Sequence, residues 1–266
     1  IFLITRIEAQ IFREADVLTL TPSLQTFRSA QIEKQGATAV LTVVHQFEEG
    51  VTVTVTVRLQ ADDPVSKWDI AVANTLPRRP RDGAIVQRVA FPILGGLKAT
   101  EADADQAVAL PDCAGRLVRE PSKTLAEPVR LEIPGWTSMS WMDLSGPTGG
   151  VYLASHDLRP IVQTILEARG ESAGQVGLSI TRWSVLWPGQ TWQPQACSVG
   201  LHTSDWHWSA DRYREWFYAT VKPRPTPAWV LAEDGWIMDG MNARFTCQNL
   251  ARTLTVAQNN GINYIQ

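Results

Sequence analysis

Val51-Thr52-Val53-Thr54-Val55-Thr56-Val57-Arg58-Leu59 alternates apolar and polar residues at every position. In an extended strand the valines and Leu59 point to one face, and the threonines and Arg58 point to the other. This pattern is typical of a sheet with one buried face. A turn signal, Glu48-Glu49-Gly50, joins the stretch to residues 39–46, so the two segments predict a β-hairpin.

Further strands are expected at similar spacing along the first 200 residues. Trp68, Ile70 and Val72 alternate again, and the strand 85–91 is expected to stop at Pro92 and the following Gly95-Gly96. Turn residues then separate six more apolar segments, at 130–133, 138–144, 150–155, 161–167, 177–185 and 195–201. Many strands with little helical periodicity predict a mainly β fold, a large antiparallel β-supersandwich.

The pattern becomes helical after residue 208. Ser209 suits an N-cap, and Trp208 before it is expected to pack on Tyr213 as a hydrophobic staple. Tyr213, Trp216, Phe217 and Thr220 then share one helix face, and the helix is expected to stop before Pro223. The proline-rich segment 222–227 is the best domain boundary, which divides the chain into 1–208, 209–227 and 228–266.

The last segment reads as a strand, a helix and a second strand. Residues 235–238 suit the first strand, the helix ends at Asn259-Asn260-Gly261, and 262–266 begin the second strand. One β-α-β unit is not a stable domain by itself, so we expect the start of an incomplete (β/α) barrel. Its uncovered edges predict self-association, disorder or packing against the sandwich.

Composition excludes several classes of function. The chain has 266 residues, 44% apolar and 19% charged, and a net charge of −3, so we expect neither nucleic acid nor a membrane as partner. Three distant cysteines without a CxxC pair imply no zinc site, and no cofactor or metal is expected. The GxSxG, Walker A, HExxH and GxGxxG motifs are absent. The alternating Glu101, Asp103 and Asp105 favour a solvated acidic loop over a calcium site. The cellular compartment stays open.

Ten of the eleven tryptophans lie between Trp136 and Trp236, among carboxylates and imidazoles. Indole faces beside polar groups suit sugars, because pyranose CH groups stack on the ring while the hydroxyls need polar partners. The alternative is that these tryptophans are core residues. The candidate carbohydrate-binding residues are Trp136, Trp141, Asp143, His156 and Asp157.

A resemblance rests on two stretches, GGVYLASHD at 149–157 and WHWSADRYREW at 206–216, followed by Pro227-Ala-Trp229 and Gly235-Trp236. They resemble the N-terminal region of uncharacterised bacterial glycoside-hydrolase-like proteins, in which a galactose-mutarotase-like supersandwich precedes a catalytic (β/α)8 barrel. The resemblance implies that the catalytic carboxylates lie on barrel strands after Gln266, so this chain by itself is expected to be inactive.

Four functions compete at this point. The first is an accessory sandwich of a glycoside hydrolase that contributes to binding an oligosaccharide or polysaccharide. The second is an autonomous carbohydrate-binding module, and the third is a structural sandwich without a ligand. The fourth is a mutarotase-type epimerase, which needs an acid and a base, His156 with Glu167 or Asp143. An exposed tryptophan with polar neighbours favours a binder, whereas burial of all tryptophans favours a scaffold.

Overall fold

The computed structural model describes residues 8–13, 16–48, 50–76, 85–158, 163–232 and 247–262. The chain divides into two compact units, Ile1–Glu215 and Trp216–Gln266. The division falls inside helix α2 (Trp206–Val221), just ahead of the proline-rich linker.

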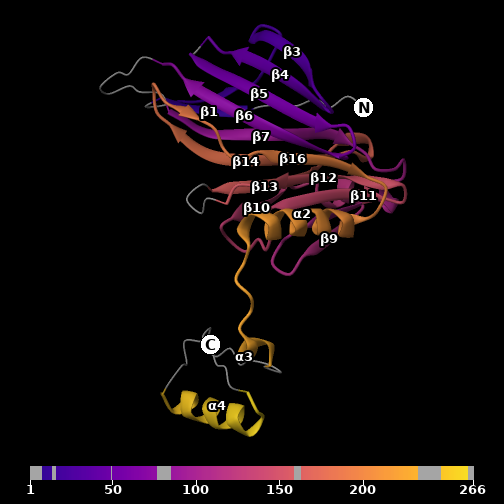
Figure 1. Cartoon of the computed structure of the whole chain (residues 1–266), viewed down its shortest axis with the longest axis vertical. Coiled ribbons are helices and arrows are strands. Elements are labelled where there is room, and N and C mark those ends of the chain that lie inside the picture. Colours follow the sequence, from indigo (N-terminus) through magenta and orange to yellow (C-terminus); the bar gives the residue numbers. More distant parts are fainter. Residues whose placement is uncertain are drawn as a thin grey trace. The chain divides into compact units, whose positions relative to one another are not determined.

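Two antiparallel sheets make up the first unit (Figure 1). Among the described residues, the smaller sheet has six strands. Their spatial order is β10 (Val129–Ile133), β13 (Thr164–Gly170), β14 (Val176–Leu186), β7 (Ile85–Leu97), β1 (Glu8–Arg13) and β2 (Asp16–Leu20).

The larger sheet has ten strands within the same described part of the chain. The order is β3 (Phe27–Gln35), β4 (Thr38–Gln46), β5 (Val51–Gln60), β6 (Val65–Asn74), β16 (Cys197–His202), β12 (Gly149–Ser155), β11 (Trp141–Gly146), β8 (Ala107–Leu110) and β9 (Arg116–Arg119), and β15 (Thr191–Trp192) also pairs with β6. Short helical turns at η1 (Asp103–Asp105), α1 (Pro121–Thr124) and η2 (Ser172–Gly174) connect strands. The mainly β, antiparallel architecture expected from the sequence is confirmed.

The alternating valines of β5 point into the core between the sheets. Val51 and Val53 are fully buried, and Thr42 and Thr56 pair across the β4–β5 hairpin on the opposite face. Both sheets supply the apolar side chains of this core, which include Ile70, Val72, Phe91, Leu94, Leu144, Leu153, Leu166 and Ile180. The hairpin predicted from the period-two pattern is therefore confirmed, because each face meets the environment that its side chains favour.

Strand β7 is longer than the sequence predicts, since it runs through Pro92 and Gly95-Gly96 to Leu97. A proline has no N–H to donate and is usually excluded from central strands. Here the described pairing with β1 ends at Ala90, and the register with β14 shifts between Ser179 and Thr181. Pro92 therefore lies at an irregularity of the β7–β14 ladder, where no described pairing requires its missing N–H.

Strand β11 is shorter than predicted, because it begins at Trp141 and residues 134–140 form a loop. Its two faces are both buried. Met142 and Leu144 belong to the core between the sheets, whereas Asp143 points to the outer face and bonds to α2. Figure 1 shows α2 lying along this part of the larger sheet.

Helix α2 begins earlier than the sequence suggests. Asp205 is the N-cap, since its Oδ1 accepts a hydrogen bond from the backbone N–H of His207 at 3.0 Å. Ser209, expected at this position, is in the helix and buried. Trp208 lies inside the helix and so does not hold the position of the expected staple, and its ring stacks on His202 at 4.9 Å. The predicted stop before Pro223 is confirmed.

The second unit contains α3 (Ala228–Leu231) and α4 (Cys247–Asn259). The expected helix end is confirmed, since Gly261 has a φ of +68° and the N–H of Ile262 bonds to the carbonyl oxygen of Ala257 at 2.9 Å. The two strands expected at 235–238 and 262–266, and with them the barrel start and the self-association it implies, lie outside the described residues, apart from Ile262.

Candidate functional site

Trp136 is the most exposed of the five candidate sugar-binding residues, with 76% of its surface accessible. It lies in the loop that leads from β10 in the smaller sheet to β11 in the larger sheet. An exposed indole on a surface loop is the feature that a sugar platform requires.

Hydrogen bonds fix the Trp136 loop against its neighbours. The carbonyl oxygen of Trp136 accepts from the N–H of Cys113 at 2.8 Å, and the N–H of Ser138 donates to the carbonyl of Pro111 at 2.9 Å. The Thr137 hydroxyl donates to the carbonyl of Glu132 at 3.0 Å. The segment bonded to this loop carries an Asp112–Arg116 ion pair at 3.5 Å. The backbone that carries the indole is thus held in place before any ligand binds.

Trp141 and Asp143 are buried, with 3% and 0% of their surfaces exposed. The indole N–H of Trp141 donates to the sulfur of Met139 at 3.3 Å. Both side chains lie beneath the surface in this structure, so neither can contact a bound sugar. They act in packing and in a polar network instead.

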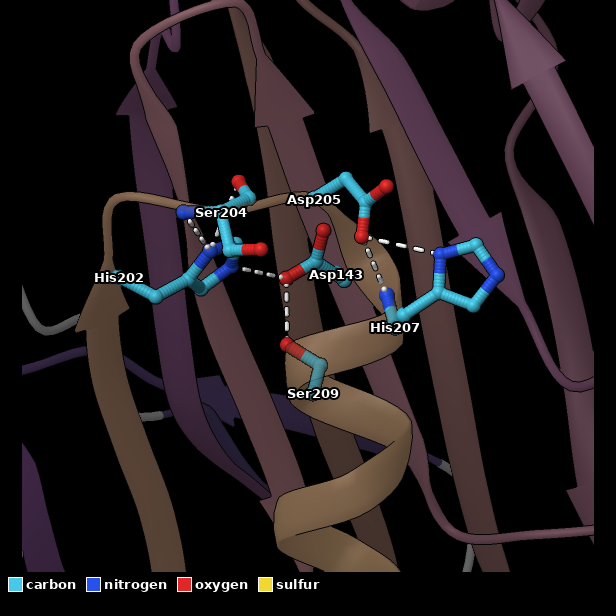
Figure 2. A network of polar contacts seen from close by, with 6 residues as sticks. All are labelled: Asp143, His202, Ser204, Asp205, His207 and Ser209. Atoms are coloured by element: carbon cyan, nitrogen blue, oxygen red, sulfur yellow. Dashed lines mark hydrogen bonds and ion pairs between the residues drawn. The ribbon is translucent and has the colours of Figure 1, made fainter.

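Asp143 is the centre of that network, which joins β11, β16 and α2 (Figure 2). Its Oδ2 accepts from the Ser209 hydroxyl at 2.6 Å and contacts Nε2 of His202 at 2.7 Å. A carboxylate only accepts, so Nε2 of His202 carries a proton when Asp143 is ionised. Nδ1 of His202 lies 3.0 Å from the carbonyl oxygen of Ser204.

The network is not a nucleophile–base–acid triad. Ser209 and His202 bond to the same carboxylate oxygen, so His202 is not placed to take a proton from the Ser209 hydroxyl. Asp143 Oδ1 is buried and has no hydrogen-bond partner among the residues that the structure describes. This arrangement fixes α2 to the sheet and offers no nucleophile to a substrate.

His156 and Asp157 follow the end of β12 and are half-buried. Nε2 of His156 lies 2.7 Å from the Ser198 hydroxyl, and its ring stacks on Tyr213 with a centroid separation of 6.3 Å. Burial, with the positive charges of Arg182 and Lys67, lowers the pKa of His156 to about 4. At neutral pH this imidazole is therefore uncharged.

An epimerase would need His156 beside Glu167 or Asp143, but these side chains bond to other residues. Asp143 bonds to His202 and Ser209, and Glu167 accepts from Arg130 at 2.6 Å on the smaller sheet. His156 contacts the Ser198 hydroxyl. The described contacts therefore bring neither carboxylate to His156.

The acidic run at 101–105 has structural partners. Glu101 pairs with Lys98 at 2.7 Å, and Asp103 Oδ1 accepts from Gln106 and from the N–H of Ser122. Asp103 to Asp105 form a 3-10 turn. Within the described ranges, no group of three or more His, Cys, Asp or Glu is placed to hold a metal ion. No helix in that part of the chain is long and apolar enough to cross a membrane.

Comparison with protein-family models and with curated proteins finds no match. Solved structures do match. The α-N-acetylgalactosaminidase NagBb of Bifidobacterium bifidum, in complex with GalNAc, aligns with a TM-score of 0.60 and 11% identity. The alignment covers 97% of this chain and 45% of that one. The GH36 α-galactosidase AgaA of Geobacillus stearothermophilus aligns with a TM-score of 0.50 and 12% identity, covering 97% of this chain and 38% of that one.

The chain folds as a β-sandwich that is similar to part of each of these two structures. At such low identity the likeness concerns the fold alone, and it confirms the β-sandwich that the sequence resemblance indicated. The chain spans less than half the length of these two hydrolases.

Sequence reasoning missed the partners of Asp143 in the sandwich. The chain separates Asp143 from His202 by 59 residues and from Ser209 by 66. A weak signal was present, since Asp143 interrupts an otherwise apolar strand, and a carboxylate in such a place needs buried donors. Which donors it meets follows only from the pairing of β12 with both β11 and β16.

Proposed function

We propose that this chain is the accessory β-sandwich domain of a glycoside hydrolase and that it contributes to carbohydrate binding through Trp136. The observation that carries the proposal is the 76% exposure of this indole on a loop fixed by hydrogen bonds. The fold shared with two glycoside hydrolases supports it.

Trp136 suits a pyranose for physical reasons. Its large apolar surface stacks on the CH face of a sugar ring. The indole side chain has few rotatable bonds, so ordering it on binding costs little conformational entropy. Asp112 and Arg116, on the segment bonded to the Trp136 loop, supply an acceptor and donors for hydroxyl groups. His156 and Asp157 remain secondary candidates, because both keep part of their surface accessible.

The proposal places the hydrolytic carboxylate pair outside these 266 residues. It is supported by length, since the chain covers 38% to 45% of the hydrolases that share its fold. It is also supported by the partners of the acidic candidates, since Asp143 and Glu167 serve structural contacts within the sandwich. NagBb is an α-N-acetylgalactosaminidase and AgaA an α-galactosidase, so α-linked galactose-type oligosaccharides are the first ligands to test.

The test is a calorimetric titration of the chain with such oligosaccharides, assayed in parallel for release of reducing ends. We expect saturable binding without release, and we expect Trp136→Ala to abolish the binding while the melting temperature stays unchanged. Trp187→Ala is the matched control, because Trp187 is also exposed, at 53%, but follows β14 in another loop. Equal loss in both variants, or hydrolysis by the chain itself, contradicts the proposal.

An autonomous carbohydrate-binding module is the second candidate. It is favoured by the Trp136 loop, since the hydrogen bonds that fix this loop come from residues of the first unit. A module binds its sugar with the same affinity whether or not the rest of a hydrolase is attached. An accessory domain gains affinity when the catalytic domain is present. Comparing the dissociation constant of this chain with that of a longer protein carrying a barrel separates the two.

A further inference from the structure

Helix α2 is attached to the sandwich by unusually few buried residues. Of its sixteen residues only Ser209 and Tyr213 are buried, and neither is aliphatic. Helices that cover a sheet normally bury an apolar stripe, which holds them down by the hydrophobic effect. Two contacts of these buried residues hold α2 on the sheet, together with half-buried side chains such as Trp208 and an ion pair between Arg212 and Asp63 at 2.6 Å.

The first contact is made by Ser209 at the start of the helix. Its hydroxyl donates to Asp143, whose carboxylate also contacts His202 (Figure 2). Trp208 packs beside them, stacked on His202 and edge-on to Tyr152 at 6.0 Å. This contact anchors the first turn of α2.

The second contact is made by Tyr213, one turn further along. Its ring lies nearly parallel to that of His156, at an interplanar angle of 11°, and its hydroxyl bonds to the backbone of Ser140. His156 is held from the other side by Ser198 of β16. The imidazole is thus half-buried between the sheet and α2, and lifting the helix exposes more of it to water.

We propose that α2 is an acid-sensitive latch, which stays on the sheet while His156 is neutral and opens ahead of the rest of the sandwich when His156 binds a proton. The linker 222–227 follows α2 directly in the chain, so the latch determines where that linker is anchored. The inference does not depend on the proposed sugar binding.

The charges around His156 set the direction of the effect. Arg182 of β14 and Lys67 of β6 both oppose a second positive charge, and burial beneath Tyr213 removes the water that would solvate it. Arg182 is itself buried, with Nη2 donating to the Ser155 hydroxyl at 2.8 Å. Opening α2 restores water to His156 and relieves this opposition, so acid favours the open state.

The size of the effect follows from linkage. A histidine with a pKa of about 4 when covered and 6.5 when exposed increases the opening constant about twentyfold between pH 7 and pH 5. Because α2 has few buried residues, its opening needs less free energy than unfolding the core strands.

Hydrogen exchange of the full chain, followed by mass spectrometry of its peptides, measures the opening directly. After correction for the intrinsic exchange rate, we expect protection of residues 206–215 to fall about twentyfold from pH 7 to pH 5. Protection of β5 and β6 should stay unchanged. Unchanged α2 protection, or equal loss in the core strands, overturns the proposal.

Three variants sharpen the test. His156→Gln keeps a neutral donor near Ser198, so it should remove the pH response of α2. His45→Gln is the matched control, because burial also lowers the pKa of His45 but it lies on β4, and here the response should persist. Tyr213→Ala should leave α2 unprotected at both pH values. A pH response that survives His156→Gln or Tyr213→Ala, or that disappears in His45→Gln, overturns the latch.

Discussion

Asp143 shows how one buried side chain links distant parts of this chain. Its carboxylate is fully buried and one oxygen accepts two hydrogen bonds, whereas the other oxygen has no partner within the described part of the chain. A buried charge is costly unless it is paired, so removing a partner harms stability more than the pair itself contributes. Asp143 therefore specifies how α2 packs on β11 and β16 more than it adds net stability.

Replacing Asp143 tests this role. We expect Asp143→Ala to lower the free energy of unfolding by about 3–5 kcal/mol, because His202 and Ser209 lose their buried acceptor. Ser209→Ala, which removes one neutral donor, should cost about 1–3 kcal/mol. Urea denaturation of both variants and of the double variant measures the coupling. Strictly additive losses would show that the two side chains act independently.

Replacing the buried Trp141 should lower the free energy of unfolding much more than replacing the exposed Trp136. Trp141→Ala creates a cavity at a side chain that is 3% exposed, so we expect a loss of about 3–5 kcal/mol. Trp136→Ala removes a side chain that is 76% exposed, so we expect a change within about 0.5 kcal/mol. Thermal unfolding of the two variants checks the difference, and equal losses would show that Trp136 is a structural residue.

At the level of elements, the β11–β12 hairpin places the polar network. Asp143 pairs with Tyr152, and Gly150 pairs with His202 across the next ladder, so the hairpin sets the register between carboxylate and imidazole. The turn ends at Gly149, which has a φ of +138° and whose added Cβ would lie 2.0 Å from the carbonyl oxygen of His202. This close approach requires glycine.

A substitution in this turn tests its importance. We expect Gly149→Ala to cost more than about 3 kcal/mol, since backbone conformation and contact both oppose a side chain. Gly189→Ala is the control, because Gly189 also has a positive φ, +81°, but nothing lies within 4 Å of an added Cβ. It should cost only about 1–2 kcal/mol. Chemical denaturation of both variants measures the two losses of unfolding free energy. Similar losses would show that the backbone conformation alone requires glycine at Gly149.

At the level of the whole molecule, His156 makes stability depend on pH. The unfolded chain binds a proton at this residue below about pH 6.5, whereas the folded chain binds it only below about pH 4. Stability therefore rises with pH across that window, and the part due to His156 is fully present above it. A pKa lowered from 6.5 to about 4 corresponds to about 3.5 kcal/mol once His156 is fully protonated, and about 3 kcal/mol of this is lost by pH 4.

The measurement is a series of urea denaturation curves between pH 4 and pH 7. We expect the free energy of unfolding to fall as the pH decreases, and to fall by about 3 kcal/mol less in His156→Gln. His45 contributes in the same direction, because burial also lowers its pKa. Parallel curves for the wild type and His156→Gln would show that His156 is solvated in the folded chain.

The fold class was predictable because strand periodicity is local. The alternation at 51–59 predicted a hairpin and its buried face, and the helix end before Pro223 followed from the chemistry of proline. The end of β7 was mispredicted, because the strand continues past Pro92 to Leu97. A proline is tolerated inside a strand only where no neighbouring strand needs a hydrogen bond from its position. That condition depends on strands remote in the sequence.

The candidate site was predictable only in part. Composition singled out tryptophans beside carboxylates, but it did not distinguish the exposed Trp136 from the buried Trp141, five residues further on. Their difference arises because α2 and the sheet enclose the outer face of β11, whereas the Trp136 loop crosses between the sheets at the surface.

The sequence by itself determined the mainly β sandwich, the hairpin at its edge, the helix that ends it and the likeness to glycoside-hydrolase sandwiches, because each rests on local patterns or short motifs. Only the tertiary structure decided that Asp143 meets His202 and Ser209, that His156 lies beneath Tyr213, and which tryptophan reaches solvent. Burial and pairing at these positions depend on contacts between residues up to 66 positions apart. Local periodicity cannot predict such contacts, because it reflects only neighbouring residues in the sequence.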